Sequence, residues 1–514
     1  MIYPQNFETK IGFDEIRDLL KQRCLSTLGK GKVDDMAFSS DADEIKEWIE
    51  QTREFRHIQD GADDFPLQYF FDVREAIKRI RLENTHLEES ELFDLRRSLQ
   101  TINDIVRYLN RAEDKGEDVD PAPLYPALYR LTQDVATYPQ LVQGIDQILD
   151  KFGHIRDNAS PELLNIRREL ARAESSVSKT LYSILRSAQS EGLVDKDVTP
   201  TLRDGRLVIP VMPGMKRKIS GIVHDESATG KTVFIEPSEV VEANNRIREL
   251  ESEERHEIIR ILTTFTNKVR PHSRDILESY SFLATIDFIR AKAELAKLTK
   301  AIEPEITDKP HVDWIQSRHP LLQLSLEKQG KKVVPLDIIL NKDKHILIIS
   351  GPNAGGKSVC LKTVGLLQYM VQCGLSIPVG DRSTVGIFDN VMIDIGDEQS
   401  LENDLSTYSS HLLNMKNMMR QANNKTIILI DEFGTGTEPQ IGGAIAEAVL
   451  EQFCNKGAWG VITTHYTNLK LYASGPDTHV TNGAMLYDSS RIEPMFKLEI
   501  GLPGNSFAFE LARK

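Results

Sequence analysis

The sequence predicts a multidomain protein in which helical segments are followed by an α/β domain. Three observations support this fold class. Residues 1–158 contain amphipathic helical patterns joined by short polar loops. Two long helical patterns follow, with a short β-rich stretch between them. From about residue 301 onward, short apolar strands alternate with helices, which is typical of a parallel sheet covered by helices.

Composition and charge restrict the class of protein. Of the 514 residues, 40% are apolar and 27% are charged, which is the balance of a folded globular protein with several domains. The 77 acidic residues outnumber the 63 basic ones, and the net charge is −14. This balance excludes a protein that coats nucleic acid through a generally basic surface, so any such contact must come from a local patch.

The chain carries no signal for a membrane or an oxidising compartment. Its first residues lack a basic region followed by an apolar run, and no stretch reaches the length of a membrane span. We therefore expect a cytoplasmic protein without a membrane partner. The cysteines are far apart in the sequence, which argues against a disulfide framework or a zinc site and favours core positions for Cys24, Cys360, Cys373 and Cys454.

The helical part divides into a core and a long arm. Residues 1–158 are expected to form the helical core, with Phe13 and Ile16 on an apolar face of an early helix. Residues 159–200 and 237–300 are each expected to contain a long helix, and Ser160 is placed to cap the first of these. Apolar residues near 3.5 spacing predict that the two helices pack as an antiparallel arm.

Residues 201–236 are expected to form a small β-rich unit at the end of this arm. "LRDGRLVIPV" has an Asp-Gly turn signal, and "RKISGIVHDESATGKTVFI" is typical of two strands around a polar loop. Residues 201–235 contain six basic and three acidic residues, a local charge of +3, which makes the unit a candidate nucleic-acid patch. The alternative is a solvated hairpin whose lysines favour solubility. The six are Arg203, Arg206, Lys216, Arg217, Lys218 and Lys231.

Residues 301–514 are expected to form the α/β domain, and a phosphate-binding loop lies within it. "ILIISGPNAGGKS" combines a strand, the spacing G-x-x-x-x-G-K-S and the start of a helix. In such a loop, Lys357 bonds the outer phosphates of a nucleotide and the Ser358 hydroxyl ligates Mg²⁺. The predicted ATP-binding residues are Gly351, Pro352, Asn353, Ala354, Gly355, Gly356, Lys357, Ser358 and Val359.

Two later strands end in polar residues that complement this loop. "TIILIDE" ends in Asp431, which is placed to hold Mg²⁺, and Glu432, which is placed to polarise a water for attack on the γ-phosphate. "VITTHY" ends in His465, a candidate γ-phosphate sensor. By contrast, the G-K-T at residues 230–232 follows a strand-like stretch with no helix after it, so we do not interpret it as a nucleotide site.

A helix rich in hydroxyl groups is expected to begin within "DLSTYSSHLLNM". Ser406, in this stretch, precedes Asp431 by 25 residues. A Ser or Thr N-cap is the simple interpretation. In an ABC-type ATPase, however, such a helix faces the nucleotide of a second subunit, where Ser406 and the helix dipole would stabilise charge on the γ-phosphate.

The combination of "SGPNAGGKS", "LSTYSSHL", "IDEFGTGTEP" and "TTHY" closely resembles the MutS family of DNA-repair ATPases, and in particular its MutS-two branch, which lacks the mismatch-reading front domains. The resemblance covers essentially the whole chain. It implies a helical core, a long two-helix lever, a small β-rich clamp and an α/β ABC-type P-loop ATPase domain. Residue by residue, it implies family roles for Asn353, Gly356, Lys357, Ser358, Ser406, Asp431, Glu432 and His465.

The resemblance implies an ATP- and Mg²⁺-dependent homodimer with composite ATPase sites. Its clamps would bind branched or recombination-intermediate DNA and suppress recombination. Relatives of this branch are also linked to collided ribosomes, so a ribosome-associated ATPase that binds rRNA and splits subunits is the alternative. An SMC-like structural ATPase fits less well. In that class the coiled coil separates the two nucleotide motifs, whereas here a short segment joins Lys357 to Asp431 and the long helices precede both.

Two features separate this chain from the mismatch-repair members and from the full-length members of the family. Phe13-Asp14-Glu15 matches the Phe-x-Glu mismatch motif literally, but Phe13 lies on an apolar helix face and is expected to be a packing residue. The family also continues past the ATPase into KOW-like and Smr domains, whereas this sequence ends at "NSFAFELARK", as in a shortened form. Nuclease activity is therefore not expected from these residues.

Overall fold

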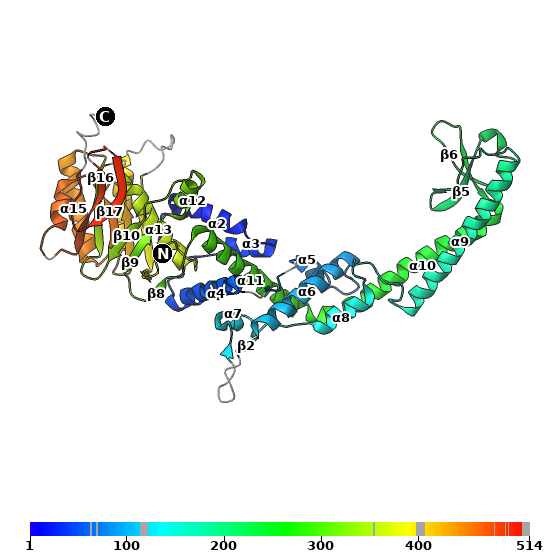
Figure 1. Cartoon of the computed structure of the whole chain (residues 1–514), viewed down its shortest axis with the longest axis horizontal. Helices are drawn as coiled ribbons and strands as arrows, with labels where there is room; N and C mark the ends of the chain where they lie inside the picture. Colours follow the sequence, from blue (N-terminus) through cyan, green and yellow to red (C-terminus); the bar gives the residue numbers. More distant parts are fainter. Residues whose placement is uncertain are drawn as a thin grey trace. The chain divides into compact units, whose positions relative to one another are not determined.

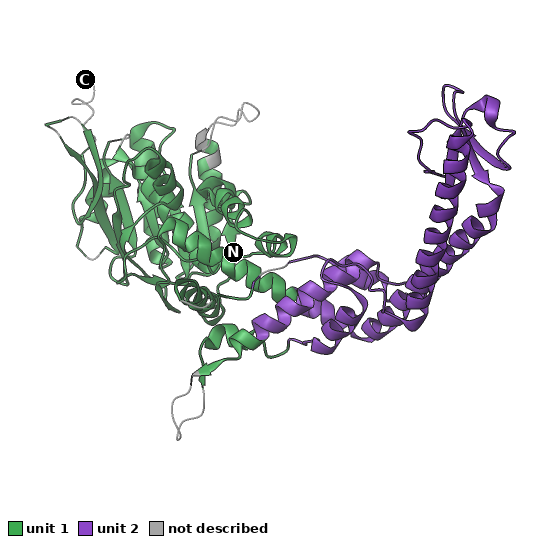
Figure 2. Ribbon diagram, turned by 45° about the vertical axis from the view of Figure 1, so that its right-hand side comes forward, with its two compact units in different colours: residues 1–66, 107–134, 281–514 green, residues 67–106, 135–280 purple. Residues whose placement is uncertain are grey.

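The protein is described by a computed structural model that covers residues 1–61, 64–67, 70–113, 122–352, 355–396, 407–476, 478–488, 490–491 and 493–505. The chain forms two compact units (Figure 2). Unit 1 comprises residues 1–66, 107–134 and 281–514, and unit 2 comprises residues 67–106 and 135–280. Among the described helices, none combines the length and apolar character that crossing a membrane requires.

A seven-stranded sheet forms the centre of unit 1, in the order β1-β13-β14-β15-β11-β16-β17. Its strands are parallel except for the antiparallel β16–β17 pair. The predicted strands "HILIIS", "TIILID" and "WGVITT" are confirmed as β11, β14 and β15. The sheet comprises β1 (Ile2–Tyr3), β11 (Ile346–Ser350), β13 (Asn390–Asp394), β14 (Thr426–Ile430), β15 (Trp459–Thr463), β16 (Val480–Asp488) and β17 (Glu493–Ile500).

Both faces of this sheet are buried, which explains why its strands are continuously apolar. In β11, Leu347 and Ile349 belong to the core on the face covered by α13 (Lys357–Gln372), whereas Ile346 and Ile348 belong to the core on the other face. That second core contains residues of α14 (Thr407–Gln421), α15 (Pro439–Asn455) and α16 (Thr467–Ala473). The helix expected after the glycine loop is therefore present as α13.

The beginning of the chain is built into unit 1. Strand β1 pairs in parallel with β13 at the edge of the sheet, and the first helices share a hydrophobic core with α13. Phe13 is fully buried and its ring meets that of Tyr369 edge to face at 4.7 Å, so its interpretation as a packing residue is confirmed. These helices are α1 (Phe7–Ile11), α2 (Phe13–Lys21), α3 (Thr27–Asp34) and α4 (Ala42–Asp60).

The remaining elements of unit 1 include a second, four-stranded sheet in the order β10-β9-β12-β8. Its strands are β8 (Glu305–Thr307), β9 (Val312–Ser317), β10 (Leu336–Leu340) and β12 (Thr384–Gly386). The others are β2 (Ala112–Glu113), β3 (Ala122–Pro123), α7 (Pro126–Arg130), α12 (Pro320–Lys328) and α11 (Ser273–Thr299), whose residues from 281 onward belong to this unit. All four cysteines are free, with Cys454 half-buried and the others buried.

Two long helices run side by side in unit 2, α9 (Pro161–Ser190) and α10 (Ser238–Val269) (Figure 1). The Ser160 hydroxyl accepts a hydrogen bond from the Leu163 N–H, so the predicted cap is confirmed. Ser160 also bonds Glu257, and Arg167 bonds Glu254 at 2.7 Å, which fixes the two helices antiparallel.

A four-stranded antiparallel sheet in the order β4-β5-β7-β6 packs against the C-terminal part of α9 and the N-terminal part of α10. Asp204 and Gly205 both have positive φ, 47° and 72°, which is the geometry of a tight hairpin turn between β4 and β5. Residues 227–232 join β6 to β7, so the rejected G-K-T lies in a hairpin. The strands are β4 (Thr201–Arg203), β5 (Arg206–Val211), β6 (Gly221–Glu226) and β7 (Val233–Pro237).

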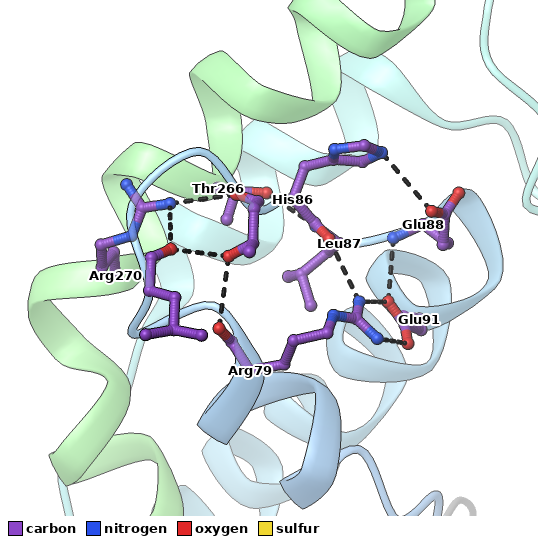
Figure 3. Close-up of polar contacts among 9 residues, drawn as sticks. Arg79, His86, Leu87, Glu88, Glu91, Thr266 and Arg270 are labelled. Carbon is purple, nitrogen blue, oxygen red and sulfur yellow. Dashed lines mark hydrogen bonds and ion pairs between the residues drawn. The ribbon is translucent and has the colours of Figure 1, made fainter.

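Shorter helices complete unit 2: α5 (Arg74–Arg79), α6 (Glu89–Leu109, to residue 106 in this unit), α8 (Pro139–Ile148), and two 3₁₀ turns, Pro213–Met215 and Arg270–His272. The connection between α5 and α6 is tied to α10 and the turn after it (Figure 3). The Leu87 N–H donates to the Thr266 hydroxyl at 3.0 Å, and Arg270 donates to the carbonyls of Ile80 and Thr85. The bond from Leu87 gives a partner to a buried backbone donor of this loop.

Candidate functional site

The candidate site lies where the parallel strands β11, β14 and β15 end. Strand β11 leads into the glycine loop, and Gly356 forms the N-cap of α13 with φ 91°. Gly351 has φ 147°, and a Cβ at this position would lie 3.0 Å from the Cβ of Met485. Only glycine fits such a position without moving its neighbours. Asn353 and Ala354 lie outside the described residues, so their predicted contacts stay predictions.

Lys357 is the first residue of α13 and is almost completely buried. Its Nζ donates to the Gly351 carbonyl at 2.7 Å and lies 3.2 Å from Nε2 of His465. Burial lowers the pKa of the Lys357 amine to about 8, although the nearby Asp431 and Glu432 oppose this shift. The loop lysine and both predicted acidic residues are therefore close enough to interact.

Asp431 directly follows β14 and is buried. Its Oδ1 accepts a hydrogen bond from the Thr463 hydroxyl, and its N–H donates to the Asp394 carbonyl at 2.8 Å. Thr463 belongs to β15, whose register with β14 places it beside the acidic pair. The sequence analysis did not single out Thr463, because a threonine at the end of a strand is common.

Glu432 is exposed and adopts φ 49°, a left-handed conformation that costs a non-glycine residue on the order of 1–3 kcal/mol. Two contacts hold its backbone there: its N–H donates to Thr463 Oγ1 at 2.8 Å, and its carbonyl accepts from the Thr435 N–H and hydroxyl. Strained residues of this kind cluster at functional sites. The carboxylate is thus held at the sheet edge but left open to solvent.

His465 follows β15 by two residues and is half-buried. Burial, and next the neighbouring Lys357, lower the pKa of its imidazole. A neutral imidazole can accept a hydrogen bond from the Lys357 ammonium through Nε2. The structure therefore brings together four residues that are separate in the sequence: Lys357, Asp431, Glu432 and His465.

The oxygen groups at this edge fit Mg²⁺ with a nucleotide. Ser358 is exposed at the start of α13, and Asp431 ends the nearby β14. Mg²⁺ is commonly held by one or two protein oxygens while phosphate and water supply the rest. Among the described residues, no cluster of three or more His, Cys, Asp or Glu could hold a metal by itself. The oxygens of Ser358 and Asp431 therefore suit a Mg²⁺ ion that binds together with the phosphates of a nucleotide.

An apolar cavity of about 450 Å³ adjoins the glycine loop. His319 at its wall has Nδ1 as acceptor for the Leu322 N–H at 3.4 Å, and burial lowers the pKa of its imidazole to about 4. The sequence analysis named only Gly356 and Val359 of this cavity, although "SRHPLL" at residues 317–322 was a signal for part of it. The lining includes His319, Leu322, Val334, Gly356, Val359, Met485 and Phe496.

Ser406 lies outside the described residues, and its predicted role stays a prediction. Helix α14, which begins at Thr407, is joined to β13 through Asp394. His411 Nδ1 lies 2.7 Å from Asp394 Oδ2, and this bond raises the pKa of the His411 imidazole. Asn414 donates to the other carboxylate oxygen at 2.8 Å. Because Asp394 also accepts from the Asp431 N–H, α14 is linked to the acidic pair.

The six basic residues predicted as a nucleic-acid patch differ in their surroundings. Arg206 donates to the fully buried Glu236 at 2.7 and 3.0 Å, so it stabilises the sheet. Arg203 is exposed, and its guanidinium lies 4.2 Å from the centre of the Phe234 ring. The other four are exposed: Lys216, Arg217, Lys218 and Lys231.

A strand, a glycine loop and a helix in this order are the phosphate-binding arrangement of P-loop proteins. Residues 347–514 match the family MutS domain V. The chain is also 38% identical to "Endonuclease MutS2" of Geobacillus sp. (strain WCH70) over 98% of its own length and 62% of that protein. It is 36% identical to the protein of that name from Enterococcus faecalis (strain ATCC 700802 / V583), over 99% of its length and 63% of the relative.

The chain is thus similar to proteins of the MutS family, and in particular to those of its MutS2 branch. The family resemblance predicted from the motifs is thereby confirmed. The matched region spans less than two thirds of the length of these relatives.

Proposed function

We propose that the chain binds ATP with Mg²⁺ and hydrolyses it to ADP and phosphate. The convergence of Lys357, Asp431, Glu432 and His465 at the ends of adjacent parallel strands carries this proposal. Lys357 would exchange its contact with the Gly351 carbonyl for the outer phosphates of ATP. Asp431 and Ser358 would hold Mg²⁺, which neutralises phosphate charge when bound.

Glu432 is the proposed general base and His465 the proposed sensor of the γ-phosphate. The exposed carboxylate of Glu432 can reach a water, while the bonds from Thr463 fix the backbone that carries it. His465 already contacts Lys357, so a γ-phosphate bound to the lysine would lie next to the imidazole.

The cavity beside the loop is the proposed site of the adenine base. Its volume and its apolar walls suit a flat heterocycle, and Gly356 and Val359 connect it to the phosphate-binding end of α13.

Nucleotide binding by the purified 514-residue chain tests this proposal. Lys357→Ala is expected to abolish tight binding of ATP in the presence of Mg²⁺, as measured by titration calorimetry. Lys456→Ala, which removes an exposed lysine after α15, is the matched control and is expected to bind like the wild type. Equal affinity in the Lys357→Ala and Lys456→Ala variants would contradict the proposal.

We also propose that the β4–β7 sheet contacts nucleic acid, with branched DNA as the substrate and rRNA as the alternative. The exposed Lys216, Arg217 and Lys218 support phosphate contacts. Binding to four-way DNA, linear duplex and ribosomal subunits, each with and without ATP, distinguishes the two. The nuclease activity named in the relatives is not part of this proposal.

A double charge reversal tests the contact surface. Arg217→Glu with Lys218→Glu is expected to weaken binding and to reduce the slope of log affinity against log salt by about one per lost phosphate contact. Arg255→Glu with Lys268→Glu, both exposed on α10, changes net charge equally and is the control. Equal slopes in the two variants would show that Arg217 and Lys218 serve solubility and do not contact phosphates.

A further inference from the structure

A second cavity in unit 1, of about 530 Å³, belongs to none of the sites described above. Helix α4 contributes Trp48, helix α11 contributes Phe288 and Lys292, and Cys373 follows the end of α13. A volume of this size is typical of sites for small organic molecules. The cavity therefore has room for a ligand, and its walls include three aromatic rings, those of Phe38, Trp48 and Phe288.

Lys292 is a buried amine in the wall of this cavity, and its side chain is 4% exposed. Its Nζ donates to the Gly374 carbonyl at 3.2 Å and lies 4.7 Å from the centre of the Phe288 ring and 6.0 Å from that of Trp48. An ammonium has three donors, and this carbonyl uses one of them.

The described part of the chain provides no counter-charge for this ammonium. None of its carboxylates forms an ion pair with Lys292. Of the other charged groups that line the cavity, Asp35 and Glu44 are exposed to solvent and Lys32 is half-buried. Glu44 instead accepts a hydrogen bond from Ser39 at 2.6 Å. Burial consequently lowers the pKa of the Lys292 amine to about 8.

A purely structural role explains only part of this arrangement. A lysine near the end of a helix stabilises the last carbonyls, and Gly374 lies two residues after the end of α13. That role does not require the amine to line an aromatic cavity without an ion pair to a carboxylate. Buried charges in proteins are normally paired, which points to a partner that is not part of the chain.

We propose that this cavity binds a small planar organic anion, whose charged group contacts Nζ of Lys292 and whose flat part lies against Trp48 and Phe288. The proposal is independent of ATP hydrolysis, because no residue of the nucleotide site lines this cavity.

Pyridoxal 5′-phosphate is a suitable probe, because it is planar, anionic and carries an aldehyde. The neutral lysine amine adds to the aldehyde carbon, water leaves, and a C=N bond forms. Borohydride then delivers hydride to the carbon and solvent supplies the proton to nitrogen, which leaves a stable secondary amine. Peptide mapping identifies the labelled lysines.

Lys292 in the wild-type protein is expected to be labelled saturably at about pH 8, and about tenfold or more faster than Lys297 on the same helix, which is exposed. Pyridoxine 5′-phosphate, which has no aldehyde, is expected to slow labelling of Lys292 but not of Lys297. ATP with Mg²⁺ is added throughout, so that labelling of Lys357 does not interfere. Labelling that rises linearly with probe, or that the competitor does not slow, would overturn the proposal.

A variant provides a second measurement. In Lys292→Met, binding of pyridoxine 5′-phosphate is expected to be weakened about tenfold or more, since the contact to a charged group is lost. Lys297→Met is the control. Unchanged affinity in Lys292→Met would show that the anion does not bind at this amine.

Discussion

The amine of Lys357 lies 3.2 Å from Nε2 of His465, although the two residues are 108 positions apart in the chain. One follows β11 and the other follows β15, and these strands are neighbours in the sheet. The contact links the residue proposed to hold the phosphates with the one proposed to sense them. The contact also makes the protonation state of the Lys357 amine sensitive to the neighbouring groups.

This sensitivity predicts a pH dependence of ATP binding. The protonated amine binds phosphate, and its pKa is lowered to about 8, so the binding form is complete below pH 7 and is lost as pH rises through 8. We expect the Kd for ATP with Mg²⁺ to be about tenfold higher at about pH 9 than at about pH 7. Titration calorimetry across this range checks this. A constant Kd would show that Lys357 stays protonated or does not contact the phosphates.

Thr463 offers a test of how the acidic pair is positioned. Thr463→Val removes the donor to Asp431 and the acceptor for the Glu432 N–H, at a cost of about 1–3 kcal/mol in stability. We expect ATP hydrolysis to fall about tenfold or more, because the barrier rises when the proposed base is misplaced. Thr463→Ser keeps the hydroxyl and is expected to retain most of the activity. Equal rates in the two variants would exclude a role for the hydroxyl.

Arg206 and Arg217 contribute equally to the charge of the β-rich unit, but their surroundings in the structure differ. Arg206→Gln leaves Glu236 buried with fewer donors, and we expect the opening free energy of the β4–β7 sheet to fall by on the order of 3 kcal/mol. Hydrogen exchange of the β5 and β7 amides measures this change. Arg217→Gln is the control and should leave exchange unaltered, because Arg217 is exposed. Similar protection in both variants would contradict the assignment of Arg206 as a stabilising residue.

These cases show what sequence patterns can and cannot predict. The spacing G-x-x-x-x-G-K-S and the apolar strand before Asp431 are local, so both motifs and their strands could be predicted. Thr463 could not, because its role depends on the register between β14 and β15. Strand β1 has only two residues, Ile2 and Tyr3, too few for any periodicity. Charge counting could not separate Arg206 from Arg217, since burial decides which of them is paired.

The cavity beside the glycine loop illustrates the same limit. Val359 was predicted from the loop itself, whereas Met485 and Phe496 reach the cavity from β16 and β17, more than 120 positions later. Their place is determined by the order of strands in the sheet, which a local pattern does not contain.

The homodimer that the family resemblance implies predicts that a defect at Ser406 affects the partner subunit. A Ser406→Arg chain keeps Lys357 and Glu432 but would place bulk against the γ-phosphate of its partner. A Lys357→Ala chain lacks its own phosphate contact but keeps Ser406. We expect mixing the two inactive variants to restore turnover, because the heterodimer contains one site with a good Lys357 and a good Ser406.

The mixing experiment requires that heterodimers be shown to form, for example by pull-down of a tagged chain. Formation without recovery would return Ser406 to the role of a helix N-cap, whose loss costs about 1 kcal/mol in stability.

Glu432 provides the most direct test that this chain is an ATPase. Glu432→Gln removes the proposed base but leaves Lys357 and the loop intact, so ATP should bind with near wild-type affinity while phosphate release in a single turnover falls by about 100-fold or more. Glu438→Gln, an exposed residue at the start of α15, is the control. Phosphate release by Glu432→Gln at the wild-type rate would contradict the account.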